Sequence, residues 1–184
     1  MDVLLTNDDG IDAAGLGVLY RTLDAMDDVT VTAVAPVDDQ SAVGRALNHE
    51  VDIQTHEYGY AVDGTPTDCV VAALGALGID PDIVVSGCNR GANLGEYVLG
   101  RSGTVSAAVE AAFFDVPAIA VSLYVPLSED FVFAETETPA SAYALAANTT
   151  EYLVANGLDS GVFEHADYLN VNSPVAEQAP AEMV

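Results

Sequence analysis

Basic residues are almost absent from this sequence. Its 184 residues include only 4 lysines and arginines together, all of them arginine, against 29 aspartates and glutamates, and the formal net charge is −25. So acidic a chain repels the phosphate backbone of nucleic acids and anionic membranes, and we expect it to bind neither nucleic-acid polymers nor membranes. The lack of lysine also excludes a Walker loop, which needs one to hold phosphate.

Cysteines, long apolar runs and targeting features are scarce or missing too. The two cysteines, Cys69 and Cys88, have no zinc-ligand spacing and make no disulfide framework, and we expect both to be buried apolar residues. No apolar run reaches the roughly 18 residues of a membrane span, and the N-terminus lacks a basic flank with an apolar segment. These features favour a soluble protein of the cytoplasm.

Apolar residues, by contrast, are abundant. At 51% of the sequence they suffice for the core of one domain, which argues against the disorder common in acidic chains. We therefore expect a folded protein adapted to concentrated salt, which shortens the range of charge repulsion to a few ångströms. The expected domain covers residues 1–172, and residues 173–184 form a C-terminal tail.

The apolar pattern predicts alternating strands and helices. Strands at 3–5 and Val29–Ala35 flank a helix with apolar residues at helical spacing over Ala13–Met26, which is a βαβ unit with parallel strands. The other expected strands are a hairpin over Glu50–Val62 and single strands over Ile83–Ser86, Pro117–Tyr124 and Tyr168–Val171. The other expected helices cover Cys69–Leu77, capped by Thr67, a segment from Ser102 with an apolar face that includes Phe113, and Ala140–Asn156. A loop is expected over Gly87–Arg101 and a mobile lid over Val125–Pro139. This order predicts an α/β fold.

Two adjacent carboxylates, Asp8 and Asp9, follow the first predicted strand. Open α/β sheets bind their ligands at the carboxyl ends of such strands. Neighbouring acids repel each other, so a pair at this place usually needs a cation, a shared proton or solvent. The stretch Asn7–Gly10 is also good turn chemistry, so the residues alone leave open both a hard-metal site and a solvated turn.

Polar loops follow two more predicted strands, at Asp38–Ser41 and Ser86–Asn93. In a parallel sheet they converge with Asn7–Gly10 on one edge, where they offer carboxylate, hydroxyl and amide oxygens. Ligation by oxygen alone suits Mg²⁺ or Mn²⁺ better than Zn²⁺. The histidines lie outside these loops, and we expect surface or core roles for them: His49, His56 and His165.

A phosphate site is one interpretation of Ser102-Gly103-Thr104, which begins a predicted helix. Free backbone N–H groups and the positive helix end favour phosphate there, although Ser and Thr are also ordinary helix caps. Beside a metal loop, such a turn suggests polarisation of a phosphoryl oxygen and activation of water. Arg21 is expected on a helix surface, and each remaining arginine either binds an anion or pairs with a carboxylate: Arg45, Arg90 and Arg101.

Two other phosphate-binding classes fit poorly. Gly10–Gly17 lacks the glycine spacing of a dinucleotide-binding loop. A phosphoacceptor receiver domain also begins with paired acids after its first strand, by analogy of fold, but it usually needs a lysine that this chain lacks.

Five motifs follow one another along the chain. They are Leu4–Gly10, Ala35-Pro36 with Gln40-Ser41, Gly64–Asp68, Val84–Gly95 and Ser102–Val105. Together they resemble the SurE family of survival-protein nucleotidases, in family order and across roughly the first two thirds of a typical member. The resemblance implies a three-layer α/β/α sandwich with a Rossmann-like, mainly parallel sheet.

The resemblance also implies a function. Family members are hydrolases of the 5′-nucleotidase or acid-phosphatase type, which use one divalent ion, Mg²⁺ or Mn²⁺, to release phosphate from nucleoside 5′- and 3′-monophosphates. The metal ligands map onto Asp8, Asp9, Ser41 and Asn89, of which Asp8 and Asp9 are the expected catalytic residues. The residues expected near the substrate phosphate are Asn7, Asn93, Arg101, Ser102, Gly103 and Thr104. A homo-oligomer, a dimer, is expected.

Three departures from the family pattern bear on this expectation. Cys88 stands where an aliphatic residue is usual, and Arg101 stands where an aromatic residue is usual. Family members also continue for several dozen residues beyond the strand near Leu169, in a region that builds oligomers. The alternative hypothesis is therefore a catalytically silent module that binds nucleotide or metal and has lost the C-terminal part of the family fold.

Overall fold

One seven-stranded sheet forms the middle layer of the computed structural model, which describes residues 1–125 and 138–175. The strand order is β3-β4-β2-β1-β5-β6-β7, and within this sheet β3 alone runs antiparallel to its neighbour. The strands are β1 (Asp2–Thr6), β2 (Thr30–Pro36), β3 (Ile53–His56), β4 (Gly59–Val62), β5 (Ile83–Arg90), β6 (Ala118–Tyr124) and β7 (Tyr168–Pro174). The mainly parallel α/β architecture predicted from the sequence is confirmed.

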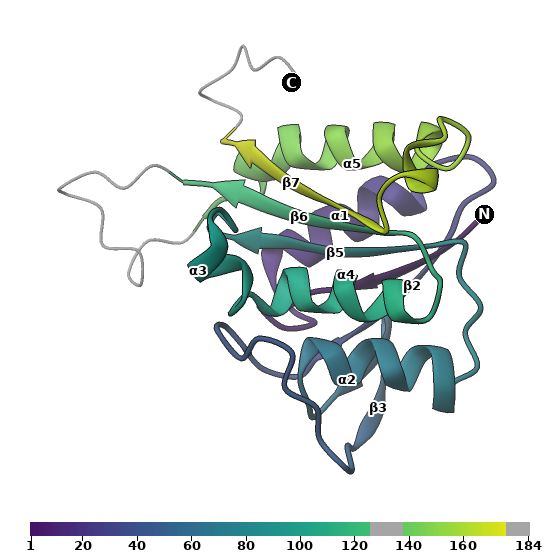
Figure 1. Ribbon diagram of the computed structural model, residues 1–184, viewed down its shortest axis with the longest axis vertical. Coiled ribbons are helices and arrows are strands. Elements are labelled where there is room, and N and C mark those ends of the chain that lie inside the picture. Colours follow the sequence, from purple (N-terminus) through teal and green to yellow (C-terminus); the bar gives the residue numbers. More distant parts are fainter. Residues whose placement is uncertain (126–137, 176–184) are drawn as a thin grey trace, which may run out of the picture.

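Helices cover both faces of this sheet (Figure 1). Helices α1 (Ala14–Asp24) and α5 (Ala144–Asn156) pack on one face, and α2 (Pro66–Val71) and α4 (Gly103–Phe113) pack on the other. The shorter elements are α3 (Glu96–Leu99), a π-helical turn η1 (Ala72–Ala76) that continues α2, a 3₁₀ turn η2 (Ala140–Tyr143) that leads into α5, and a second 3₁₀ turn η3 (Val162–Glu164). The result is the expected three-layer sandwich.

Strand β1 lies at the centre of the sheet, between β2 and β5. Its side chains alternate between the two layers, because Val3 and Leu5 belong to the core under α1 and α5, and Leu4 belongs to the core under α2 and α4. Burial on both faces explains the unbroken apolar run by which this strand was predicted. The strand order reverses at this place, and the carboxyl end of β1 is therefore where an open α/β sheet binds its ligands.

Helix α2 begins earlier than predicted, and its cap is Thr65 rather than Thr67. The Thr65 side chain accepts a hydrogen bond from the backbone N–H of Asp68 at 3.1 Å, and Asp68 Oδ2 accepts one from the backbone N–H of Thr65 at 2.7 Å. This reciprocal capping box, followed by Pro66 at the first helical position, defines the start of the helix. The prediction placed the start at the apolar run and missed the cap before it.

Strand β5 is also longer than predicted, since it runs to Arg90 rather than ending near Ser86. After an irregularity in the pairing, Asn89 and Arg90 pair with β6, which brings their polar side chains to the edge of the sheet. The segment that follows was predicted as loop as far as Arg101, and it contains the short helix α3.

The buried face of α4 agrees with the prediction at Val105 and Ala108 and differs from it at Phe113, whose side chain is 69% exposed. The helix also buries Ala107 and Ala111. Both cysteines are fully buried, as predicted, and burial raises the pKa of each thiol.

Two expectations fall largely outside the described residues. The predicted lid, Val125–Pro139, consists mostly of residues 126–137, and most of the predicted tail is 176–184. Strand β7 runs to Pro174, three residues beyond its predicted end. Within residues 1–125 and 138–175, no helix has the length and apolar character needed to cross a membrane.

Candidate active site at the carboxyl edge of the sheet

The loops that follow β1, β2 and β5 meet at one edge of the sheet, as predicted. The backbone N–H of Gln40 donates to the carbonyl of Asp8 at 2.7 Å, which joins the loop after β2 to the loop after β1. The backbone N–H of Arg90 donates to Asp9 Oδ2 at 3.0 Å, which joins the loop after β1 to the end of β5. These contacts hold the three loops in fixed relation to one another.

A cavity of about 180 Å³ opens between these loops and the start of α4. It brings together six of the ten residues predicted for the site: Asp8, Ser41, Asn89, Asn93, Arg101 and Ser102. Arg90 and Val98 also line it. The four other predicted residues, Asn7, Asp9, Gly103 and Thr104, do not line this cavity, and their places are described below.

Asp8 is buried, with 3% of its surface exposed, and lies against the start of α4. Its Oδ1 atom accepts a hydrogen bond from the Thr104 hydroxyl at 2.6 Å. Gly103 leaves room for this contact, because a Cβ atom there would lie 2.7 Å from Asp8 Cβ. Burial raises the pKa of Asp8, and the hydroxyl and backbone N–H of Thr104 oppose this rise because they stabilise the charged form. The turn predicted to bind phosphate holds the Asp8 carboxylate in this structure.

Asp9 faces the opposite layer. It lines a second cavity, of about 340 Å³, together with the start of α1, Arg90, Thr138 and Tyr143. Burial and the neighbouring charge of Asp8 raise the pKa of Asp9 to about 7, and the backbone N–H of Arg90 opposes the rise. Because consecutive residues at the end of an extended strand point to opposite faces, one carboxylate lies on each side of the sheet. Arg90 lines both cavities and connects them.

Asn93 is held from behind by residues that the sequence analysis did not select. Its Nδ2 atom donates to Ser122 Oγ at 2.9 Å, and its backbone N–H donates to Asn172 Oδ1 at 2.8 Å. Asn170 Nδ2 donates to the carbonyl of Asn93 at 2.9 Å. The polar side chains of Asn170 and Asn172, which alternate with Val171 on the last strand, were the available signal.

Asn7 is completely buried and does not reach either cavity. Its Nδ2 atom donates to the carbonyl of Gly10 at 2.8 Å, so it closes the turn that carries the two carboxylates. Its Oδ1 atom has no hydrogen-bond partner among the described residues. Asn7 therefore shapes the turn that carries the two carboxylates.

Two of the arginines lie away from the cavity, and Arg101 lies at it. Arg45 forms an ion pair with Glu110 at 2.8 Å, and Arg21 lies on the surface, as predicted. Arg101 lies at the cavity, with its guanidinium 3.9 Å from the centre of the Tyr97 ring and a hydrogen bond to the Tyr97 carbonyl at 3.3 Å. Within residues 1–125 and 138–175, Arg101 stacks on Tyr97 and forms no ion pair with a carboxylate, which was the alternative to anion binding.

The oxygen donors at this edge fit a hard cation. The Asp8 carboxylate, the Ser41 hydroxyl and the Asn89 amide line one cavity, and no cluster of three His, Cys, Asp or Glu residues suited to a metal occurs in the described ranges. Such a donor set suits Mg²⁺ or Mn²⁺ and does not suit Zn²⁺. Of the histidines, His56 contacts Asp12 at 3.2 Å, away from the cavity.

The fold and the site define an α/β protein of Rossmann-like architecture, with an acidic, oxygen-rich site where the strand order reverses. A sequence model of the family described as survival protein SurE matches residues 3–184. The chain belongs to this family, and the resemblance carried by its five motifs is confirmed.

Proteins similar to this chain are longer than the part of them that it matches. A protein named 5′-nucleotidase SurE from Haloarcula marismortui is 63% identical over 98% of this chain and 66% of its own length. The protein of the same name from Natronomonas pharaonis is 61% identical over 100% of this chain and 71% of its own length. The crystal structure of the SurE protein from Aquifex aeolicus superposes with a TM-score of 0.77 at 34% identity, covering 95% of this chain and 66% of that one. The chain thus spans about two thirds of the relatives that it matches.

Proposed function

We propose that this protein is a phosphomonoesterase that releases phosphate from nucleoside 5′-monophosphates and also from 3′-monophosphates. The observation that carries the proposal is the cavity in which a buried carboxylate, a hydroxyl and two amides meet the start of a helix. The similar proteins named 5′-nucleotidase SurE support the 5′ activity and favour an enzyme over the catalytically silent module.

The proposed cofactor is one divalent ion, Mg²⁺ or Mn²⁺, held by Asp8, Asp9, Ser41 and Asn89. When bound, such an ion polarises phosphoryl oxygens and lowers the pKa of water. The two carboxylates lie on opposite sides of the strand end, and Asp9 must be ionised to act as a ligand. A cation held by both carboxylates would favour that ionised form, because it would oppose the burial and repulsion that raise the pKa of Asp9.

Asp8 is the proposed general base, or the group that orients the attacking water. Its carboxylate is fixed by Thr104, so it need not reorganise when substrate binds. The proposed phosphate side of the cavity consists of Asn93, Arg101 and Ser102. Asn93 is fixed by β6 and β7, whereas Arg101 is exposed and supplies the positive charge that a phosphate requires.

The test is a phosphatase assay of the purified chain in molar KCl with saturating Mn²⁺ or Mg²⁺ and a panel of nucleoside 5′- and 3′-monophosphates. We expect phosphate release that depends on the metal and is lost in Asp9→Asn. Asp38→Asn is the matched control, because Asp38 is an exposed carboxylate in the neighbouring loop. Metal binding without turnover in the parent would contradict the proposal and support the silent module. Gel filtration in the same buffer tests the proposed dimer.

A further inference from the structure

The motif Gly64–Asp68 has no role in the site described above, yet it contains a buried carboxylate that accepts three hydrogen bonds from N–H groups. Asp68 is 3% exposed, and its Oδ1 atom accepts the backbone N–H of Asn48 at 2.8 Å. Its Oδ2 atom accepts Asn48 Nδ2 and the backbone N–H of Thr65, each at 2.7 Å, and lies 3.0 Å from the Thr65 hydroxyl. Two of the three N–H donors belong to Asn48 in the loop after β2, and the third belongs to Thr65 in the cap of α2.

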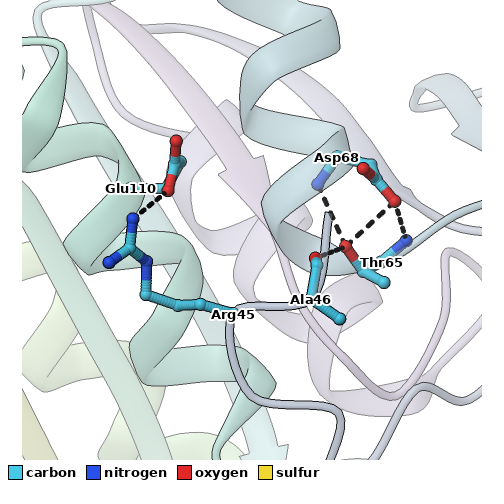
Figure 2. A network of polar contacts seen from close by, with 5 residues as sticks. All are labelled: Arg45, Ala46, Thr65, Asp68 and Glu110. Carbon is cyan, nitrogen blue, oxygen red and sulfur yellow. Dashed lines mark hydrogen bonds and ion pairs between the residues drawn. The ribbon is translucent and has the colours of Figure 1, made fainter. Parts of the chain in front are cut away.

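A second contact from the same motif holds that loop. The Thr65 hydroxyl donates its single proton to the carbonyl of Ala46 at 2.7 Å, the shorter of its two contacts with acceptors. Figure 2 shows Thr65 and Asp68 at the start of α2 with Ala46 beside them, and Arg45 extended toward Glu110. The start of α2 therefore holds two positions of the loop, Ala46 and Asn48.

The loop held in this way is the one that lines the cavity. Its first part is attached at Gln40, which donates to the Asp8 carbonyl, and Gly44 donates to the carbonyl of Arg101 at 2.9 Å. Ser41 and Ala42 lie between these attachments and line the cavity. Because Ser41 is exposed and carried by a loop, the place of its hydroxyl depends on the attachments on either side.

We infer that Asp68 is a positioning residue of the proposed active site, which acts through Asn48 to hold Ser41 where it can bind the metal. The inference rests on the proposed function. Residues that orient a metal ligand from behind typically change metal affinity or activity by about 10–100-fold when they are replaced. The usual role of such an Asp, capping a helix, predicts a loss of stability alone.

The variant that separates the two roles is Asn48→Ala. It removes one donor to Asp68 from the exposed side of the loop and leaves the capping box of α2 intact. We expect faster amide hydrogen exchange over residues 41–48, about tenfold weaker Mn²⁺ binding by calorimetric titration, and nearly normal kcat once Mn²⁺ is saturating. Asp68→Asn should show the same changes together with a lower Tm, and Asp63→Asn, an exposed acid beside the motif, should show none of them.

The outcomes distinguish this inference from the proposed function. If Asn48→Ala leaves hydrogen exchange or Mn²⁺ affinity at the parent value, or if Asp68→Asn lowers only Tm, Asp68 is a helix cap and the inference is wrong. A parent that binds no Mn²⁺ also overturns it. A parent that binds Mn²⁺ but releases no phosphate contradicts the proposed function, while the exchange and titration results still decide the role of Asp68.

Discussion

The two faces of the sheet at the carboxyl end of β1 differ in how they hold a carboxylate. On the side of α4, Asp8 receives a hydroxyl and a backbone N–H from Thr104 and faces a cavity lined by polar side chains. On the side of α1, Asp9 receives one backbone N–H and shares its cavity with Arg90, Thr138 and Tyr143. Burial raises the pKa of both carboxylates, but Asp8 is also held by short contacts with Thr104, whereas Asp9, with a pKa of about 7, has one backbone N–H. Adjacent residues of one type acquire different chemistry from the two layers that they face.

The largest expected effect is the loss of the fixed carboxylate. Asp8→Asn keeps the volume and can still accept a hydrogen bond from Thr104, but it removes the charge and the basic oxygen. We expect kcat for phosphate release from adenosine 5′-monophosphate to fall by about 10²–10⁴-fold, the usual contribution of a general base. Asp38→Asn serves as control. Retention of more than a tenth of the parent kcat would assign the base role to another group.

Thr104→Val should have the next largest effect. It replaces the hydroxyl donor to Asp8 with a methyl group of the same shape. A hydrogen bond to the charged form lowers a pKa, so its loss raises the pKa of Asp8 and moves the acidic limb of the pH–rate profile to higher pH. We expect about 10–100-fold lower activity at the parent optimum. Thr104→Ser, which keeps the hydroxyl, should restore both the rate and the profile.

Arg101→Tyr tests the phosphate side of the same cavity with a smaller effect. The guanidinium is exposed and stacked on Tyr97, so its contact with a dianion is partly screened by water. We expect about tenfold higher KM for the nucleotide, with unchanged Mn²⁺ affinity and Tm lowered only slightly. Nucleotide binding equal to that of the parent would show that Arg101 has a structural role only.

On the side of α1, the expected effect is on stability. The pKa of Asp9 in the fold, about 7, lies above the 3.8 of the free side chain, so the bound proton stabilises the fold at low pH and this contribution is lost as pH rises through about 7. In metal-free protein, Asp9→Asn should therefore raise Tm at pH 8 and change it little below about pH 4, where Asp9 is protonated in both the folded and the unfolded chain. Thermal unfolding with a chelator measures both values. An equal change at the two pH values would contradict the shifted pKa.

Salt should raise the Tm of the parent but have the smallest effect on the Tm difference between the parent and Asp9→Asn. Repulsion between exposed carboxylates is screened within about 3 Å at 1 M salt, so the parent, with its net charge of −25, should have a higher Tm in molar KCl than in dilute buffer. Asp8 is buried and Asp9 is half-buried, so salt screens them less than exposed charges and the Tm gain of Asp9→Asn at pH 8 should persist in molar KCl. Scans of both proteins across KCl concentrations measure the two effects. A parent Tm that stays flat or falls would contradict adaptation to salt.

Local sequence patterns predicted much of this arrangement. The apolar run before Asp8, the polar residues after three strands and the family motifs placed the central strand and the convergence of loops. Other features depend on contacts that span the chain and leave no local pattern. Thr104 meets Asp8 across 96 residues, and Asn172 meets Asn93 across 79. The cap at Thr65 was missed for a different reason, because its signal lay before the apolar run that was taken as the helix.

One residue that lines the second cavity has no side chain. Gly15, which lines it, lies so close to β5 that a Cβ atom there would fall 2.1 Å from the carbonyl oxygen of Cys88. Helix α1 therefore meets the sheet backbone to backbone at this point. Substitution can reshape the cavity beside Asp8, where Ser41 and Arg101 project from loops. Gly15 offers mutation no comparable freedom, because any side chain there would push the helix away from the sheet. Directed evolution of this chain should therefore keep Gly15 while it varies the loop residues beside Asp8.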